Sequence, residues 1–171
     1  MQLQPLLKNE NLTLEPLKVS DFEALYKVAS DPLIWEQHPT KNRYQRDVFQ
    51  TYFDGAIQSK GAFLVRDAKT LEVIGCTRYY DFNEETKTIT IGYTFLARSH
   101  WGGKYNPAMK KLMIDYAFQF VDKILFHIGA TNIRSQTAIQ RIGAKKITEK
   151  NIAYHGEQSN LNFVYCLEKK S

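Results

Sequence analysis

A short segment in the middle of the chain joins a strand-like run to a helical pattern, and it reads Trp101-Gly102-Gly103-Lys104-Tyr105-Asn106-Pro107. Its two glycines allow the backbone to come close to a ligand. Asn106 suits the N-cap position of a helix, and Pro107 suits the first helical position. The first N–H groups of a helix have no partner within it, and the helix dipole attracts anions. The segment therefore predicts a loop that binds phosphate groups.

The same glycines also fit a second interpretation, a tight strand-to-helix connection without a ligand. The loop differs from both common phosphate motifs. Tyr105 follows Lys104 where a Walker A loop has Ser or Thr, and Pro107 occupies the region of the third glycine of the dinucleotide-binding fingerprint. Positive charge nearby favours an anionic ligand, and it comes from Lys104, Lys110 and Lys111.

The patterns on either side of this loop predict the elements that position it. Residues 88–96 are rich in β-branched and aromatic side chains, which is typical of a strand. Residues 107–120 carry apolar side chains at helical spacing. The side chains that this helix is expected to bury are Met109, Leu112, Met113, Tyr116, Ala117 and Phe120. We therefore expect the loop to rest on a packed core.

The N-terminal third of the chain predicts one strand and two helices. Residues 11–17 alternate apolar and polar side chains, and Ser20 with Glu23 forms a capping-box pattern in which Ser20 is the N-cap. The helix that follows is expected to bury Phe22, Leu25, Tyr26 and Ala29. A second helix is predicted over residues 46–60, closed by Gly61. Its apolar face consists of Val48, Phe49, Tyr52, Phe53 and Ile57.

The remaining runs predict further strands and one short helix. Strands are expected at residues 62–66, 73–80, 124–128 and 162–167, and a helix at residues 135–142 that ends at Gly143. The order of elements combines helices with an antiparallel meander, and no repeat or linker interrupts it. One α+β domain over residues 1–171 fits this order.

Composition narrows the classes of function. The chain has 171 residues, 43% of them hydrophobic, and a net charge of +5. No apolar run is long enough to span a bilayer, and the first residues lack a secretory pattern. Cys76 and Cys166 lie in separate apolar runs, so buried free thiols in a reducing, cytoplasmic setting are expected. The excess lysines are expected at the solvated surface. Binding of nucleic acid is not favoured, because the sequence shows no basic run interleaved with exposed aromatic residues.

A second block supports the phosphate loop, and it runs Asn132-Ile133-Arg134-Ser135-Gln136-Thr137-Ala138-Ile139-Gln140-Arg141-Ile142-Gly143-Ala144. Together the two blocks resemble the GNAT superfamily of acetyl-CoA-dependent N-acetyltransferases, in particular the branch that acetylates ribosomal-protein N-termini. The resemblance extends from Leu12 to about Lys146. The family's loop has the pattern Gln/Arg-x-x-Gly-x-Gly/Ala, which aligns with residues 101–106, and Lys104 and Asn106 depart from its small residues.

The resemblance implies a mixed, mostly antiparallel central sheet flanked by helices on both faces. It implies direct transfer of an acetyl group from acetyl-CoA to a primary amine, on a protein N-terminus or a small molecule, by a monomer or homodimer without a metal. A non-catalytic acyl-CoA-binding module of the same fold is the alternative. His100 and His127 show no metal-ligand spacing, and His155 lies in a predicted turn.

The resemblance also assigns residues to acetyl-CoA. Backbone N–H groups on the strand before the loop hold the pantetheine arm and polarise the thioester carbonyl in this family. The positions implied for this chain are Phe95, Leu96 and Ala97. The loop residues implied in pyrophosphate binding are Trp101, Gly102, Gly103, Lys104, Tyr105 and Asn106. Asn132 and Ser135 complete the set from the second block.

Catalytic roles follow less directly. Ile139 stands where many members have the tyrosine that protonates the leaving thiolate, and Ser135 matches a serine that the resembling branch offers instead. A plain helix N-cap is the other interpretation of Ser135. Thr90 replaces the usual glutamate base, which leaves deprotonation through water. The residues considered to assist deprotonation of the amine are Glu36, His38 and Tyr93.

The acceptor amine is expected between the first two helices and a facing strand. The residues assigned to this pocket are Trp35, His38, Arg78 and Tyr80, with Tyr79 beside them. Hydrophobic packing is the alternative for Trp35, and a loop hydrogen bond before Pro39 is the alternative for His38.

Overall fold

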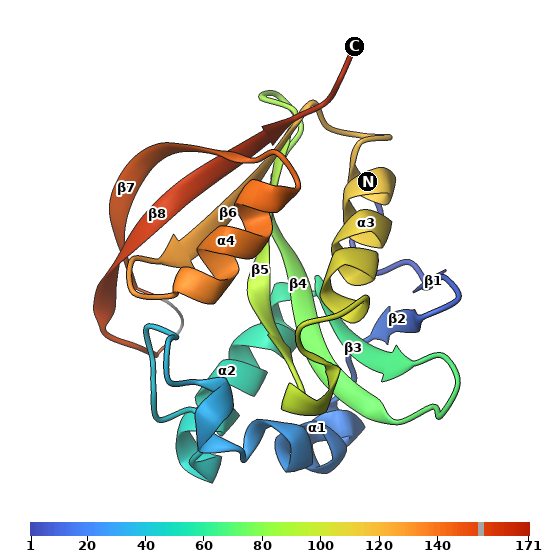
Figure 1. Cartoon of the computed structure of the whole chain (residues 1–171), viewed down its shortest axis with the longest axis vertical. Helices are drawn as coiled ribbons and strands as arrows, with labels where there is room; N and C mark the ends of the chain where they lie inside the picture. The colour runs from blue at the N-terminus through green and yellow to red at the C-terminus, as the bar shows by residue number, and fades with distance from the viewer. Residues whose placement is uncertain (154–155) are drawn as a thin grey trace.

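The structure is a computed structural model that describes residues 1–153 and 156–171, so the turn predicted at His155 lies outside the described residues. Its eight strands form one sheet in the order β1-β2-β3-β4-β5-β6-β8-β7 (Figure 1). Neighbouring strands are antiparallel except β5 and β6, which are parallel. The strands are β1 (Leu7–Lys8), β2 (Leu12–Pro16), β3 (Ala62–Asp67), β4 (Val73–Asn83), β5 (Thr88–Leu96), β6 (Lys123–Gly129), β7 (Lys145–Ala153) and β8 (Ser159–Glu168).

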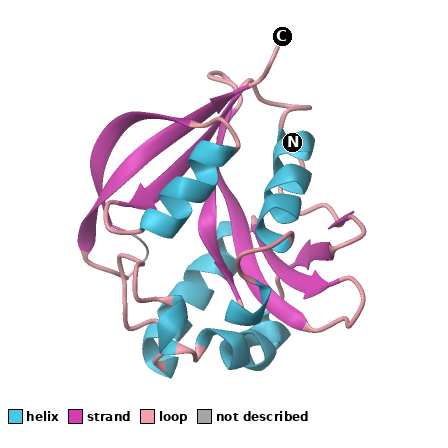
Figure 2. Ribbon diagram, viewed as in Figure 1, coloured by secondary structure: helices cyan, strands magenta, loops and turns pink. Residues whose placement is uncertain are grey.

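Helices cover both faces of the sheet, as the ribbon in Figure 2 shows. They are α1 (Phe22–Ala29), α2 (Arg46–Ser59), α3 (Tyr105–Ala117) and α4 (Ile133–Arg141). One buried cluster joins α1 and α2 to one face, and a second cluster joins α3 and α4 to the opposite face. The mixed, mostly antiparallel architecture with helices on both faces is therefore confirmed.

The strand predicted at residues 88–96 is confirmed with its bounds. The strand predicted at residues 11–17 is one residue shorter at each end, and the other predicted strands are present with small extensions. β1 and β7 were not predicted. β7 escaped notice because all but one of its nine residues are exposed, so it has no apolar alternation. Cys76 and Cys166 are buried free thiols, as expected. No described helix is long and apolar enough to cross a membrane.

The predicted capping box at the start of α1 is wrong. The segment Val19–Asp21 forms a short 3-10 turn, and the α1 N-cap is Asp21. The Asp21 carboxylate instead accepts a hydrogen bond from the Lys18 backbone N–H at 2.8 Å. Glu23 does not reach back to the helix start, because its carboxylate pairs with Arg46 on α2 at 2.6 Å.

Two predicted helix ends also need correction. Lys60, not Gly61, ends α2 in the left-handed conformation, with φ of 52°. Gly61 is needed for a different reason, since a Cβ there would lie 2.0 Å from the Tyr79 carbonyl oxygen. The helix predicted over 107–120 stops at Ala117, and Phe120 is 42% exposed because it lies beyond the helix rather than on its buried face.

The feature of the sheet that matters most for function is the separation of β5 from β6. The two strands are paired only over Thr88–Thr90 and Lys123–Leu125. The pairing of β5 with β4 shifts register between Cys76 and Arg78, opposite Tyr93, whose φ of 54° marks a bulge. Beyond this bulge the second half of β5 has no registered partner in β6. The sheet is therefore open between these strands.

Candidate active site

The loop after β5 is held firmly on the sheet. The Trp101 indole N–H donates to the Leu96 carbonyl at 2.9 Å. The Tyr105 hydroxyl donates to the Asp67 carboxylate at 2.8 Å, and His100 Nε2 lies 3.1 Å from the same carboxylate. Hydrogen bonds from the Lys69 and Thr70 backbone N–H groups and from Tyr105 keep the pKa of Asp67 well below its usual value. These contacts join the loop to the turn after β3.

The loop presents backbone N–H groups to solvent. α3 begins at Tyr105 with Lys104 as N-cap, and no side chain caps it, so the predicted N-cap role of Asn106 is wrong. Ala108 makes the first helical hydrogen bond, to the Lys104 carbonyl. Among the described residues, none accepts a hydrogen bond from the N–H groups of residues 102–104, and those of the first helical residues have no partner within the helix. This row of donors fits an anion.

The two glycines contribute differently. Gly102 has a φ of 69°, a conformation that other residues adopt only with strain. At both Gly102 and Gly103 an added Cβ would meet no atom within 4 Å, so protein crowding does not require glycine there. The open space and the donor row together suit the approach of a bulky anionic ligand such as the pyrophosphate of coenzyme A.

The predicted amide contacts to the pantetheine arm need one correction. The Ala97 N–H already donates to the Ile74 carbonyl on β4 at 2.7 Å, so it is committed to the sheet and does not face the gap between β5 and β6. Phe95 and Leu96 lie on β5 beyond the bulge, beside this gap. Their contacts to acetyl-CoA stay predictions.

At the start of α4 the capping role belongs to Asn132, not Ser135. The buried Asn132 side chain accepts a hydrogen bond from the Ser135 N–H at 3.3 Å, and Ser135 is the third residue of the helix. The helix thus starts earlier than predicted. Among the described residues, none is hydrogen-bonded to the Ser135 hydroxyl. Ile139, at the family's tyrosine position, is packed in the core, and Thr90, at the glutamate position, is buried.

Glu36 lies beside Arg134, which contacts the loop after β5. Its carboxylate lies 3.4 Å from Arg134 Nη1, and the Arg134 guanidinium stacks on Trp101 at 4.2 Å from the ring centroid. The Arg134 N–H also donates to the Gln37 side chain at 3.1 Å. These contacts connect the segment after α1, the start of α4 and the phosphate loop. Glu36 as a base remains a prediction.

Trp35 packs in the core instead of lining an open acceptor pocket. Its ring is fully buried against Phe95, and its indole N–H donates to the Ala29 carbonyl at 2.8 Å. The packing alternative is therefore the one that the structure shows. His38 lies edge-on to this ring at 4.9 Å. Desolvation, and then the charges of Arg43 and Arg134, lower the pKa of His38 to about 3, so its imidazole is neutral near pH 7 and a weak proton acceptor.

Tyr93 and Tyr80 come together on the face of the sheet covered by α2. Their rings are 5.1 Å apart, and the Tyr80 hydroxyl is 3.4 Å from His127 Nδ1 on β6. Tyr52 of α2 donates to the Tyr93 carbonyl at 2.5 Å. Burial raises the pKa of Tyr93, so its phenol keeps its proton at neutral pH and can donate a hydrogen bond.

A buried ion pair that the sequence did not predict closes this region. Arg43 holds the Glu157 carboxylate through two atoms, Nε at 2.8 Å and Nη2 at 2.7 Å, and Thr40 donates to the same carboxylate at 2.6 Å. The two side chains are only 4% and 6% exposed. The partners are 114 positions apart, so no local pattern reveals them.

Arg78 points into the same aromatic cluster and forms no ion pair with any residue that the structure describes. Its guanidinium stacks on the Tyr93 ring at 3.7 Å from the centroid and lies 5.7 Å from that of Tyr52. The residue is 4% exposed, and its Nε and Nη2 atoms have no hydrogen-bond partner in the described part of the chain. Arg78 and Tyr80, both assigned to the acceptor pocket from the sequence, contact Tyr93, and their role in binding an acceptor stays a prediction.

Lys110, one of the positive charges expected near the loop, is a buried side chain. Its side chain is 7% exposed, and Nζ donates to Thr94 Oγ1 at 3.0 Å on β5. It also lies 6.0 Å from the Phe126 ring of β6, so it enters the space between the two strands. The available signal was its spacing from Met113 and Ala117, which places it on the buried stripe of α3.

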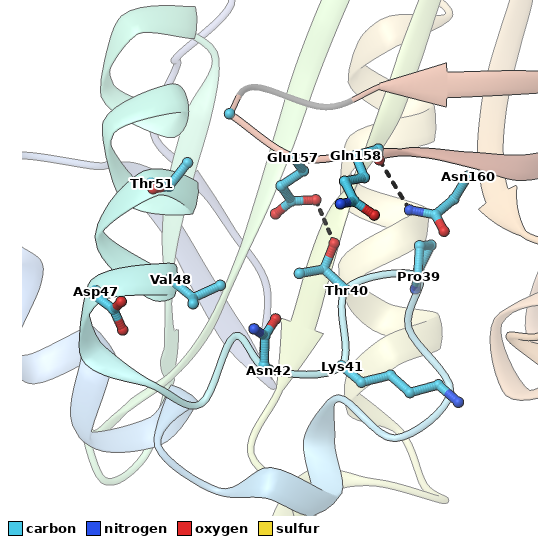
Figure 3. Close-up of a pocket in the computed structure, with 11 residues that line it drawn as sticks. Pro39, Thr40, Lys41, Asn42, Asp47, Val48, Thr51, Glu157, Gln158 and Asn160 are labelled. Carbon is cyan, nitrogen blue, oxygen red and sulfur yellow. Dashed lines mark hydrogen bonds between the residues drawn. The ribbon is translucent and has the colours of Figure 1, made fainter.

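A surface hollow of about 480 Å³ lies outside the Arg43–Glu157 pair. Figure 3 shows Glu157 and Thr40 pointing toward one another at its wall, with Thr51 on α2 across from them. None of the residues assigned to the site from the sequence lines this hollow. It is therefore a second feature that sequence reasoning missed.

Comparison with known proteins identifies the family of proteins to which the chain belongs. The family described as Acetyltransferase (GNAT) domain matches residues 11–145, and the chain belongs to this family. GNAT proteins transfer acyl groups from acetyl-CoA, and this coarse function is the one that the match supports for the chain. The row of N–H donors at the start of α3 fits the coenzyme's pyrophosphate.

Solved structures agree on the fold. A GCN5-related N-acetyltransferase from Brucella melitensis has a TM-score of 0.81 and 16% identity, covering 96% of this chain and 79% of that one. A provisionally assigned ribosomal-protein-serine acetyltransferase from Vibrio cholerae has a TM-score of 0.74 and 15% identity, covering 99% of this chain and 100% of that one. Spermidine N-acetyltransferase from Vibrio cholerae, in complex with CoA and spermine, has a TM-score of 0.65 and 19% identity, covering 92% of this chain and 95% of that one. At these identities the likeness shows the fold alone.

Proposed function

We propose that the chain, as one catalytic domain over residues 1–171, transfers the acetyl group of acetyl-CoA directly to a primary amine. The acceptor is a protein N-terminal amine or a small-molecule amine, and the setting is cytoplasmic. The observation that carries the proposal is the uncapped start of α3, with its row of unpaired N–H groups, next to the opening between β5 and β6. A coenzyme's pyrophosphate and its extended arm need these two features side by side.

Acetyl-CoA supplies an activated thioester, and the chain's residues do the rest. In the proposed reaction the amine nitrogen forms a bond to the acetyl carbon and the carbon–sulfur bond breaks. The departing sulfur takes a proton from the Ser135 hydroxyl, and this hydroxyl regains a proton through water from the nitrogen that has bonded to the acetyl carbon; Ser135 is not used as a cap because Asn132 fills that role. The amine gives up its proton through water to the solvent side, where Glu36 lies exposed.

Tyr93 and Tyr80 form the proposed acceptor side. The raised pKa of Tyr93 makes its phenol a hydrogen-bond donor rather than a base. His38, which is neutral near pH 7 and faces two arginines, is placed to accept a hydrogen bond but not to hold a proton. Deprotonation through water therefore suits this site better than deprotonation by a single side chain.

A second function, binding of an acyl-CoA without turnover, is favoured by two observations. Ile139 is buried in the core at the position of the family's tyrosine, and Thr90 is buried at the position of its glutamate. Neither residue can exchange a proton near neutral pH. The two functions share the cofactor site and differ only in chemistry.

Two measurements test these functions. Acetyl-CoA should raise the melting temperature of the protein, because a ligand that binds only the folded state stabilises it. Absence of any rise would contradict both functions. Release of the coenzyme's thiol with a panel of peptides and small amines separates them: release supports the transferase, and binding without release with every amine supports the binding module.

A further inference from the structure

Arg78 is a buried cation, and one hydrogen-bonding edge of its guanidinium has no partner among the described residues. It is 4% exposed, and within the described residues no carboxylate lies within ion-pair distance of it. The two unsatisfied atoms, Nε and Nη2, are adjacent on one edge of the guanidinium plane. A buried charge without a partner is costly, so a site that keeps one is expected to receive a ligand of opposite charge.

The same protein shows what that edge binds. Arg43 uses its own Nε and Nη2 to hold both oxygens of the Glu157 carboxylate. Arg43 and Arg78 lie near the same ring, at 5.2 Å and 5.7 Å from the Tyr52 centroid. The Nε and Nη2 edge of Arg43 is therefore occupied by a carboxylate, whereas the same edge of Arg78 has no partner in the described part of the chain. Side-by-side N–H groups match a planar carboxylate in particular.

Arg78 lies beside the part of β5 where the proposed function places the acceptor. Arg78 is paired with Gly92 on β5, directly before the bulge at Tyr93 and the opening toward β6. Its side chain stacks on Tyr93, which the proposed function places at the acceptor. An anion on this edge of Arg78 would lie beside the acceptor, on the face covered by α2. The α3 start, where the coenzyme's phosphates are expected, belongs to the opposite face.

The surrounding charges favour an anion from outside. The two arginines of this cluster face one carboxylate, Glu157, and Arg43 already holds it through both oxygens. The other acid that influences Tyr93 is Asp81, and it forms no ion pair with Arg78. The polar hollow of Figure 3 reaches Glu157, the partner of Arg43, from the surface.

We propose that Arg78 binds a carboxylate of the acceptor, so that the preferred acceptors are primary amines that carry a carboxylate a few bonds from the amine. Free amino acids have this chemistry, and so do peptides whose first residue is acidic. The inference rests on the proposed acetyl transfer for its kinetic readout. It also makes a prediction about binding that needs no turnover.

The test compares matched pairs of acceptors that differ only in one charge. Each amino acid is paired with its amide, and each peptide beginning with Asp or Glu is paired with the same peptide beginning with Asn or Gln. The wild-type protein should favour the carboxylate member by about 100-fold in kcat/KM, the range expected for a buried charge pair. A preference in the amino-acid pairs or in the peptide pairs supports the inference and tells which source supplies the carboxylate.

Arg78→Met should lower the ratio of kcat/KM between the carboxylate member and the uncharged member of each pair from about 100 to within about threefold of one. Arg78→Lys keeps the positive charge but lacks the two side-by-side N–H donors of the guanidinium, and it should retain only part of the preference. Arg66→Met is the matched control, an arginine of β3 in the same sheet whose pair with Glu15 is on the surface side. It should leave the preference unchanged.

Melting temperatures measured with each acceptor in the presence of CoA report acceptor binding without any acetyl transfer. The carboxylate members should stabilise the wild-type protein more than their uncharged partners, and Arg78→Met should abolish the difference. Failure of thiol release with every amine, together with this binding difference, would count against the transferase and not against the role of Arg78. Equal stabilisation and equal kcat/KM for both members of all pairs in the wild-type protein would overturn the inference.

Discussion

Replacing Lys110 by methionine should stabilise the protein, by an amount that depends on pH. The lysine is 7% exposed, and no carboxylate of the described residues pairs with it. Burial lowers the pKa of its ammonium from 10.5 to about 8. Since one pKa unit corresponds to about 1.4 kcal/mol, the charged lysine reduces the free energy of unfolding by about 3 kcal/mol. Loss of the hydrogen bond to Thr94 offsets about 1 kcal/mol of the gain.

The sign of the pH dependence follows from proton binding. Below about pH 8 both the folded and the unfolded chain hold the proton, and the full penalty applies. Between about pH 8 and 10.5 the unfolded chain holds more protons than the folded one, so the free energy of unfolding of the wild-type protein rises with pH. Lys110→Met lacks this rise. Its advantage of about 2 kcal/mol at neutral pH should therefore disappear by about pH 10.

Urea denaturation of both proteins across this pH range measures the difference. Lys111→Met is the matched control, because Lys111 is the next residue of α3 but is 75% exposed in its pair with Asp115. That substitution should change the free energy of unfolding by less than about 0.5 kcal/mol, to the same extent at every pH. A difference between wild type and Lys110→Met that stays constant with pH, or a less stable Lys110→Met at neutral pH, would refute the reasoning.

Three further predictions concern the loop, α4 and His38. Asn132→Ala should lower stability by about 1 kcal/mol through loss of the α4 cap, whereas Ser135→Ala should leave melting unchanged and lower turnover more than cofactor affinity. Gly102→Ala should lower stability by about 1 kcal/mol, because φ is 69° there, and should weaken the melting shift with acetyl-CoA. His38, with its pKa lowered to about 3, should show no NMR titration between about pH 5 and 8; a midpoint near 6.5 would contradict the burial argument.

The parts of the fold that could be predicted are those whose pattern is local. The strand at Thr88–Leu96 has a dense β-branched and aromatic composition, and it was predicted with its bounds. The start of α3 was misplaced by two residues because good capping residues, Asn106 and Pro107, lie inside the helix. β7 was missed because an exposed strand is held by pairing with β8 rather than by its own burial.

Features of the candidate site that depend on the backbone could be predicted from the sequence, and those that depend on packing could not. Adjacent glycines and a helix start predict the loop proposed to bind phosphate, and the structure has an uncapped helix start at this loop. The pairing of Arg43 with Glu157, and the burial of Lys110, arise only when distant segments meet. Sequence composition assigns lysine to the surface on average, so a buried lysine requires knowledge of which face of α3 meets the sheet.

The two buried cations meet the sheet at one place, from opposite faces. Tyr93 and Thr94 are consecutive residues of β5, and their side chains point to opposite sides of the sheet. Tyr93 contacts Arg78 on the α2 face, and Thr94 accepts a hydrogen bond from Lys110 on the α3 face. Each cation lowers stability where an apolar side chain of similar size would not. Stability alone does not account for two buried cations at adjacent residues of β5, and their position agrees with the proposed function, which places the acceptor beside Tyr93.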